Sequence, residues 1–137
     1  MSAAAGLALQ RAVFAALRGD EALRGLVGEA VHDAAPEGGG DLYVALGPER
    51  VRAAGDATGG GSVHVFDVSA VTARAGFGAA KAAAARVCDV LDGARLPLER
   101  GRLVSLRFRD ARAWRDRAAG TRRVDLRFRA RLDLSDS

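Results

Sequence analysis

Residues 122–134 read RRVDLRFRARLDL, and apolar side chains alternate with charged ones along the stretch. Successive side chains of an extended strand point to opposite faces of the sheet. From Val124 onward, one face of this segment therefore carries only apolar residues, and the other carries arginine and aspartate. The pattern predicts a strand with one buried and one exposed face, which is typical of an antiparallel sheet that is covered on one side.

A second strand is predicted shortly before this one, over residues 103–108. Its inward-facing side chains are expected to be Val104, Leu106 and Phe108. Residues 116–120, between the two strands, have a turn-like composition. Together these segments predict a long antiparallel β-hairpin with a bulge near Trp114. Because strands of this length rarely leave their edges unpaired, the hairpin also indicates that the chain forms oligomers.

Three helices and shorter extended segments precede the hairpin. Apolar residues at helical spacing predict helices over residues 3–18, about 21–26 and 75–92. Extended segments are predicted over 31–33, 42–46 and 62–71, with a loop over 48–61. The predicted fold class is α+β: a mostly antiparallel sheet with a long C-terminal β-hairpin, packed by an N-terminal helix and one central helix. Without a repeat or a linker, the chain is expected to form a single domain, 1–137.

The composition is that of an ordinary globular domain, with 49% apolar and 28% charged residues. The one cysteine, Cys88, lies on the apolar stripe of the predicted central helix and is expected to be a small core residue. It cannot form a disulfide within the chain. The sequence shows no signal-peptide pattern and no apolar window of membrane-spanning length, so we expect a protein that is made or assembled in the cytoplasm, without a membrane partner.

Positive charge is concentrated in the C-terminal third. Residues 100–131 contain twelve arginines and three aspartates, whereas residues 1–99 contain nine basic and twelve acidic side chains. Five arginines of the hairpin strands are predicted to form one basic sheet surface: Arg107, Arg109, Arg127, Arg129 and Arg131. Such a surface suits an anionic partner, either DNA phosphates or acidic residues of a neighbouring subunit. The alternative is an exposed strand face of an arginine-rich chain, without a partner. No basic recognition helix is predicted and aromatic residues make up 5%, so neither sequence-specific DNA binding nor a base-stacking platform is expected.

Residues that carry catalysis or bind metals are few and scattered. His32 and His64 lie far apart, and His64 faces away from Asp67. No group of His, Cys and carboxylate side chains has metal-ligand spacing, so both histidines are interpreted as satisfied polar residues at a loop or strand edge. The glycine-rich segments 59–61 and 76–81 lack the residues that complete a phosphate-binding loop or a dinucleotide motif. No enzyme activity, metal or cofactor is therefore predicted.

Four segments follow the N-terminal helix in a characteristic order. They are Leu42-Tyr43-Val44-Ala45-Leu46-Gly47, His64-Val65-Phe66-Asp67-Val68-Ser69, Gly76 at the start of the long helix, and Gly101-Arg102-Leu103-Val104 at the start of the hairpin. In this order they resemble the small tail-completion proteins of long-tailed phages, the tail terminator family, and in particular the version found in gene transfer agents. The resemblance covers nearly the whole chain. At Asp41-Leu42 the sequence departs from the family pattern, which usually has a proline before the tyrosine.

The resemblance implies a structural role and not an enzyme. Proteins of this family form a six-membered ring that caps the tail tube, stops its growth and presents a surface to the head connector. The implied partners are further copies of the chain in a hexamer, the tail tube protein, the head–tail connector or stopper protein, and DNA passing through the ring. The implied location is the tail–head junction of a phage-like particle that is assembled in the bacterial cytoplasm.

Two segments are expected to make these contacts: the loop 47–62 and the hairpin tip near residues Arg117 to Thr121. The loop includes Gly59, Gly60 and Gly61. The arginine surface either lines the DNA channel or meets an acidic neighbour, and the neighbour is favoured because strongly basic walls would retard passing DNA. Two other functions remain open. One is a module that binds DNA nonspecifically through the arginine surface, and the other is a small enzyme, which requires a pocket containing His32 or His64.

Overall fold

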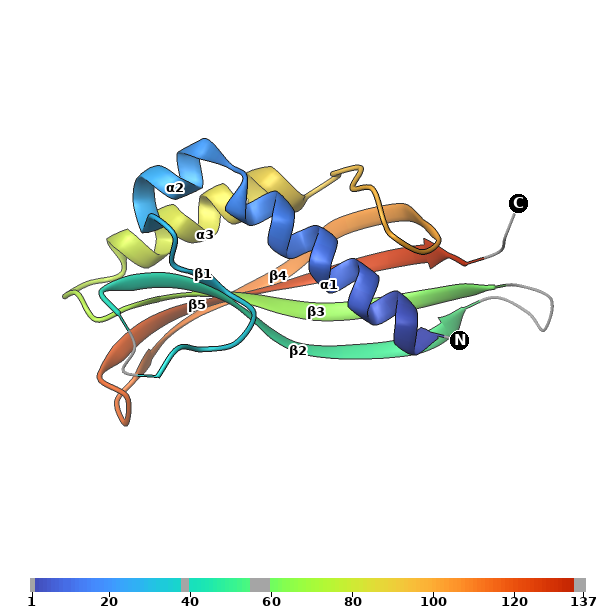
Figure 1. Cartoon of the computed structure of the whole chain (residues 1–137). Helices are drawn as coiled ribbons and strands as arrows, with labels where there is room; N and C mark the ends of the chain where they lie inside the picture. The colour runs from blue at the N-terminus through green and yellow to red at the C-terminus, as the bar shows by residue number, and fades with distance from the viewer. Residues whose placement is uncertain (1, 38–39, 55–59, 135–137) are drawn as a thin grey trace.

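The computed structural model describes residues 2–37, 40–54 and 60–134. Helices and strands follow one another in these residues (Figure 1) as α1 (Ser2–Arg18), α2 (Glu21–Val27), β1 (Val31–His32), β2 (Leu42–Ala54), β3 (Gly61–Thr72), α3 (Gly78–Leu91), β4 (Arg102–Asp116) and β5 (Thr121–Asp133). The strands form one sheet in the order β1-β2-β3-β5-β4. The short β1 pairs with β2 in parallel, and the other neighbours are antiparallel. The helices lie on one face of the sheet (Figure 1).

Strand β5 lies between β3 and β4 and contains the alternating stretch. Its inward side chains are all buried: Val124, Leu126, Phe128, Ala130 and Leu132. The ring of Phe128 stacks against Phe66 at 5.7 Å between centroids and meets Phe108 edge-on at 5.9 Å. Each such pair contributes about 0.5–1.5 kcal/mol beyond the burial of its area. The predicted α+β class, the mostly antiparallel sheet and the C-terminal hairpin are confirmed.

Helices α1 and α3 cover the inner face of the sheet with one apolar stripe each. The buried residues of these helices are Ala5, Ala8, Leu9, Val13 and Leu17 in α1 and Ala80, Ala83, Ala84, Val87 and Leu91 in α3. Cys88 packs against the core, but it is half-buried beside the α3 stripe and not buried on it as predicted. Burial raises the pKa of its thiol, and the carboxylates of Asp92 and Asp89 raise it further. The side chain is therefore a packing residue and not a reactive thiolate.

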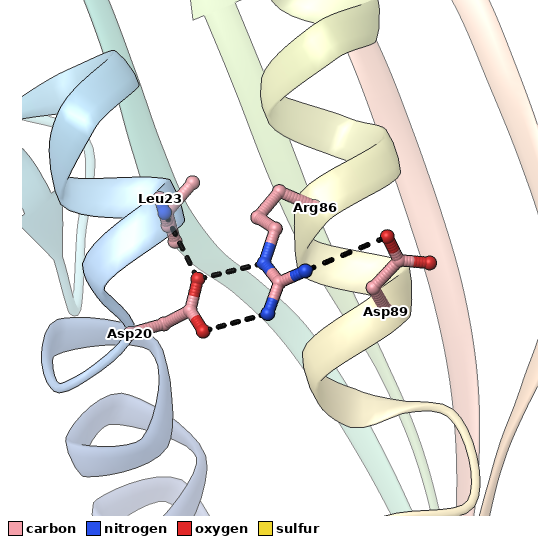
Figure 2. Close-up of polar contacts among 4 residues, drawn as sticks. All are labelled: Asp20, Leu23, Arg86 and Asp89. Carbon is pink, nitrogen blue, oxygen red and sulfur yellow. Dashed lines mark hydrogen bonds and ion pairs between the residues drawn. The ribbon is translucent and has the colours of Figure 1, made fainter.

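Helix α2 is tied to α3 through its N-cap residue, Asp20 (Figure 2). The Asp20 carboxylate accepts the backbone N–H of Leu23 at 2.9 Å and two guanidinium N–H groups of Arg86 at 2.8 and 2.9 Å. Arg86 also lies 3.7 Å from Asp89 on its own helix. The hydrogen bond from Arg86 holds the pKa of Asp20 below its ordinary value, against the effect of burial, and the Leu23 N–H adds to this. A seven-residue helix is thereby fixed at its first turn.

Strand β2 is longer than predicted. The expected loop over 48–61 is wrong in its first half, because the strand continues to Ala54. A register shift between Leu46 and Glu49 absorbs the intervening Gly47-Pro48 as a bulge. Proline is tolerated at such a position because its missing N–H breaks no regular ladder bond. A Cβ at position 47 would lie 3.2 Å from the Cβ of the neighbouring strand's Asp67, so the close approach there favours glycine.

Strand β4 contains two bulges, and neither is near Trp114 as predicted. The residues without a Cα partner on β5 are Val104 and Arg109. The first bulge turns Val104 outward, where it is 45% exposed, and places Leu103 opposite the buried Leu132. The prediction that Val104 faces inward is therefore wrong, because an extra residue in one strand reverses the face of the residues beside it.

Candidate functional site on the outer sheet face

The face of the sheet opposite the helices carries a regular array of arginine side chains. Directly opposed residues of antiparallel strands share a face. Two rows of three residues cross β2, β3 and β5 in this way. They are Arg50–Val65–Arg129 and Arg52–Val63–Arg131. We call the four arginines of these rows, Arg50, Arg52, Arg129 and Arg131, the arginine patch.

Val63 shows how the side chains of the patch lie. It points to the face that no helix covers, yet only 2% of its surface is exposed. Its cross-strand neighbours on that face are Arg52 and Arg131. Their aliphatic stems therefore cover Val63, and their guanidinium groups reach beyond it into solvent. The patch presents charge with little apolar surface between the charges.

The arginine patch is not neutralised within the described residues, where no ion pair or hydrogen bond joins its side chains to a carboxylate. The hairpin end of the same face differs. There Arg127 pairs with Asp67 at 3.2 Å, and Arg123 pairs with Asp125 at 3.1 Å. At the hairpin end of the outer face, Arg112 stacks on the Trp114 ring and has no ion pair with a described residue. The four unpaired arginines of the patch lie at the end of the sheet away from the hairpin turn.

Three donors hold Asp125 at the hairpin end. Its carboxylate accepts the Ser69 hydroxyl at 2.6 Å, the Trp114 indole N–H at 2.6 Å and an Arg123 N–H at 3.1 Å. Burial alone would raise the pKa of Asp125, but the hydrogen bonds from Ser69 and Trp114 and the charge of Arg123 together hold it below its ordinary value. Asp125 is therefore ionised at neutral pH and neutralises Arg123.

The structure separates the five arginines predicted to share one surface. Arg107 is in register with Arg129, but its Nε lies 3.4 Å from the carboxylate of Asp92 at the end of α3. Arg109 is the extra residue of the second bulge. Because Arg127 is paired with Asp67, only Arg129 and Arg131 of the predicted set belong to the unneutralised patch.

The remaining predicted interface residues lie at the two ends of the sheet. Arg117 is exposed in the turn between β4 and β5. At the other end, Gly61 begins β3 opposite Asp133, and the carbonyl of Gly60 accepts the Leu134 N–H at 2.8 Å. Gly59 lies outside the described residues.

Both edges of the sheet are largely open among the described residues. The two-residue β1 pairs with only two residues of β2, so residues 49–54 have no strand neighbour on their outer side. On the opposite edge, the end of α3 and the loop after it bond to the backbone of Leu106 and Phe108. Residues 110–116 have no such cover. Open backbone edges are groups that another strand can pair with.

Two of the surface cavities are large enough to hold a small molecule. The larger, of about 750 Å³, lies between the loop 93–98 and residues 101–107. The other, of about 310 Å³, lies on the outer face and is lined by side chains that include Tyr43 and Asp125. Neither cavity is lined by a histidine or by a residue of the arginine patch.

The family model of tail completion protein gp17 matches residues 11–133. The chain belongs to the tail completion protein gp17 family. Among solved structures, it is similar to a chain of the virion of native gene transfer agent (GTA) particle, with 54% sequence identity and a TM-score of 0.88. The match covers 97% of this chain and 99% of that one. No curated protein matches the chain.

These findings confirm the resemblance to tail-completion proteins and to their gene transfer agent version. They also support the prediction of a structural virion protein, in place of an enzyme. A structural component of a virion assembles with other proteins, so the outer face and the open edges are the features of the fold to consider for function.

The sequence does not assign Arg50 and Arg52 to the basic surface, because both fall in the predicted loop over 48–61. A signal was nevertheless present. From Glu49 to Ala53, every second residue is an arginine. A repeat of two residues is the period of a strand. The preceding Gly47-Pro48 concealed it, since that pair usually ends a strand.

A buried polar cluster that joins β2 and β3 was also not predicted. The His64 ring lies 2.8 Å from the Ser62 hydroxyl through Nε2 and 2.8 Å from the Glu49 carboxylate through Nδ1. This connectivity resembles a hydrolytic triad, but Ser62 and His64 are fully buried, so no substrate can reach the hydroxyl. His64 is a satisfied polar residue, as predicted, although it lies in a central strand and not at an edge.

His32 is half-buried at the end of β1, with its ring 6.0 Å from the ring of Tyr43. Across residues 2–37, 40–54 and 60–134, no three His, Cys, Asp or Glu side chains are grouped so that they could hold a metal ion. None of the helices in these ranges is both long and apolar enough to cross a membrane.

Proposed function

We propose that the chain is a tail terminator: a structural subunit of a phage-like particle that assembles into a ring, caps the tail tube and joins it to the head connector or stopper protein. The observation that carries the proposal is the match at 54% identity, over 97% of the chain, to a chain of a gene transfer agent virion. Membership in the tail completion family supports the same role. We propose that residues 1–137 act as one domain in this ring.

The two open edges support assembly into a ring. Residues 49–54 lie on one edge of the sheet and residues 110–116 on the other. Pairing of one edge with the opposite edge of the next copy is head-to-tail, and such contacts give a closed ring when the rotation between copies closes. Addition of a strand to an open edge is a common mode of association. Six copies are the number that the family resemblance implies.

The two ends of the sheet are the proposed docking surfaces. The hairpin turn with Arg117 projects from one end, and Gly60 and Gly61 lie at the other (Figure 1). Gly59 precedes them in the sequence and is part of the same proposed contact. Because the two ends are far apart, one can meet the tail tube protein while the other meets the head connector.

The backbone of β4 identifies a variant that tests the ring. Leu106 accepts the Gly93 N–H at 2.7 Å and Phe108 donates to Asp92 at 3.0 Å, so both residues direct their backbone groups to the outer edge. The partners of Leu106 and Phe108 on β5 are Ala130 and Phe128. The β5 partner of Ala113 is Val124, which is an even number of residues from both along β5. The N–H of Ala113 therefore points outward as well. Ala113→Pro removes an edge donor without breaking a β4–β5 hydrogen bond.

Native mass spectrometry of the purified full chain tests the proposal. The wild type should form a closed ring, and Ala113→Pro should shift the population to smaller species with an unchanged far-UV circular dichroism spectrum. Ala113→Ser, which keeps the N–H, should retain the ring. The proposal is wrong if the wild type stays monomeric at high concentration and particles without it still carry tails of normal length joined to filled heads.

A second candidate is a nonspecific DNA-binding module, which the unneutralised arginine patch favours. It requires duplex affinity that falls steeply with salt, and it requires no assembly. A ring that binds no duplex even at low salt would exclude it.

A further inference from the structure

We infer that the arginine patch binds the phosphate backbone of duplex DNA, so that the outer sheet face is the DNA-contacting surface of the subunit. The inference rests on the proposed function only for the origin of the DNA, which would be the duplex that passes through the ring. The contact itself depends on the residues of one chain.

The patch has the geometry of a charge array and not of a pocket. Arginines two residues apart on one strand are separated by about 7 Å, and those two strands apart by about 10 Å. No patch residue lines either large cavity. A duplex carries closely spaced charge along its whole length, so it can meet such an array in many registers without a moulded site.

The charge of the patch is available to a partner. None of its arginines is bonded to a carboxylate of the described residues. The carboxylate at the patch end of β5, Asp133, is already 3.4 Å from Arg102. Binding of an anion would therefore not have to break an existing ion pair of the patch.

The surroundings of the charge favour DNA over a protein partner. Stable protein interfaces depend on buried aromatic or aliphatic anchors at their centre. Of the central side chains here, Val63 is 2% exposed beneath the arginine stems, and Val65 is half-buried. No aromatic side chain lies in the two rows, so a base-stacking platform for single strands is also missing. What remains is recognition of phosphate by guanidinium.

The sequence favours an acidic protein neighbour because strongly basic walls would retard passing DNA. The ability of a protein to slide along a duplex answers this objection. Phosphate contacts are sequence-independent and allow proteins to slide along a duplex. Three of the four patch arginines are exposed, so their contacts can exchange as the duplex moves.

Fluorescence anisotropy with a labelled mixed-sequence duplex tests the inference, using the full chain in about 50–200 mM salt. The wild type should bind with a steep salt dependence. The double variant Arg129→Gln with Arg131→Gln should lower the slope of log affinity against log salt by about two, one for each lost phosphate contact. Arg50→Gln with Arg52→Gln should do the same, because the register places them on the same face.

The matched control is Arg95→Gln with Arg100→Gln. It removes the same charge from exposed arginines in the loop after α3 and should leave the slope nearly unchanged. Equal effects of control and patch variants would overturn the inference, as would absence of duplex binding by the wild type at low salt. It would also fail if patch variants weakened binding to the isolated tail tube protein and left duplex binding intact, which would indicate an acidic protein partner.

Native mass spectrometry of the same variants separates this inference from the proposed function. Arg129 and Arg131 lie on the central strand β5 and not on an open edge, so Arg129→Gln with Arg131→Gln should assemble as the wild type does. Arg50 and Arg52 belong to the open edge 49–54, so only the β5 variant separates the two proposals. A monomer that binds duplex through the patch would refute the ring and leave the inference standing. A ring that does not bind duplex would refute the inference and leave the proposed ring standing.

Discussion

Replacing Gly101 by alanine should destabilise the protein far more than the same change at Gly120. Both glycines flank strands of the hairpin and have left-handed backbone conformations, with φ of +73° and +69°. A Cβ at Gly101 would lie 2.8 Å from the backbone oxygen of Asp133 and 2.8 Å from Cδ2 of Leu134. A Cβ at Gly120 would meet nothing within 4 Å. The two variants thus share backbone strain, and only Gly101→Ala adds a collision.

The expected magnitudes follow from these two contributions. The left-handed conformation costs an alanine about 1–2 kcal/mol, and this is the whole expected effect at Gly120. Overpacking adds about 1–3 kcal/mol at Gly101, since a backbone oxygen cannot rotate away from the new methyl group. Gly101→Ala should therefore lower the free energy of unfolding by about 2–5 kcal/mol. For a chain of this size that corresponds to a fall in Tm of about 3–5 °C per kcal/mol.

Urea unfolding followed by circular dichroism measures both variants. The protein concentration must be the same in each experiment, because assembly contributes to apparent stability. The control must share the left-handed backbone conformation of Gly101. Gly120 does, whereas Gly25 does not. If Gly101→Ala and Gly120→Ala are equally destabilised, the collision with Asp133 is absent. The close approach of Gly101 to Asp133 would then be wrong.

Three further predictions concern other parts of the fold. Gly25→Ala, in helix α2 with open space around the new methyl group, should raise stability by about 0.5–1 kcal/mol in thermal unfolding; a loss would contradict it. Ser62→Ala leaves Nε2 of the buried His64 without its partner and should cost about 1–3 kcal/mol in urea unfolding, whereas an unchanged midpoint would show that the bond contributes nothing. Asp125→Asn should remove part of the acid sensitivity. Because the fold lowers the pKa of Asp125, its carboxylate stabilises the protein above the unfolded pKa of about 4, and this stabilisation disappears as pH falls through the folded value. The stability difference between wild type and Asp125→Asn should therefore shrink on acidification, and a difference independent of pH would refute the assignment.

The hairpin could be predicted because its information is local. In residues 122–134 every apolar side chain falls on one face, and a slip of one residue would expose Phe128 and bury Arg127 and Arg129. The helices could be predicted for a similar reason, since their apolar stripes repeat at helical spacing. These patterns depend only on neighbours in the chain.

The arginine patch could be predicted only in part, because its members come from two separate segments. Arg129 and Arg131 stand out in the alternating strand, whereas Arg50 and Arg52 follow a Gly-Pro pair that normally ends a strand. A bulge absorbs that pair, and the strand resumes in register with β3. The partner of His64 was missed for the same reason, since Glu49 is the first residue after the bulge.

The second bulge of β4 decides where the outer face is neutralised. Phe108 points inward, and unbroken alternation would send Trp114, an even number of residues later, inward as well. The extra residue Arg109 reverses this, so Trp114 lies on the outer face and its indole N–H reaches Asp125 at 2.6 Å. The sequence does not mark this reversal, because Arg109 continues the alternation that Arg107 and Phe108 begin and nothing identifies it as the extra residue. The ionised Asp125 is thereby fixed beside Arg123 at the hairpin end, and the four unpaired arginines of the patch remain at the other end. The position of the proposed DNA contact thus follows from backbone register, and not from the local density of arginine.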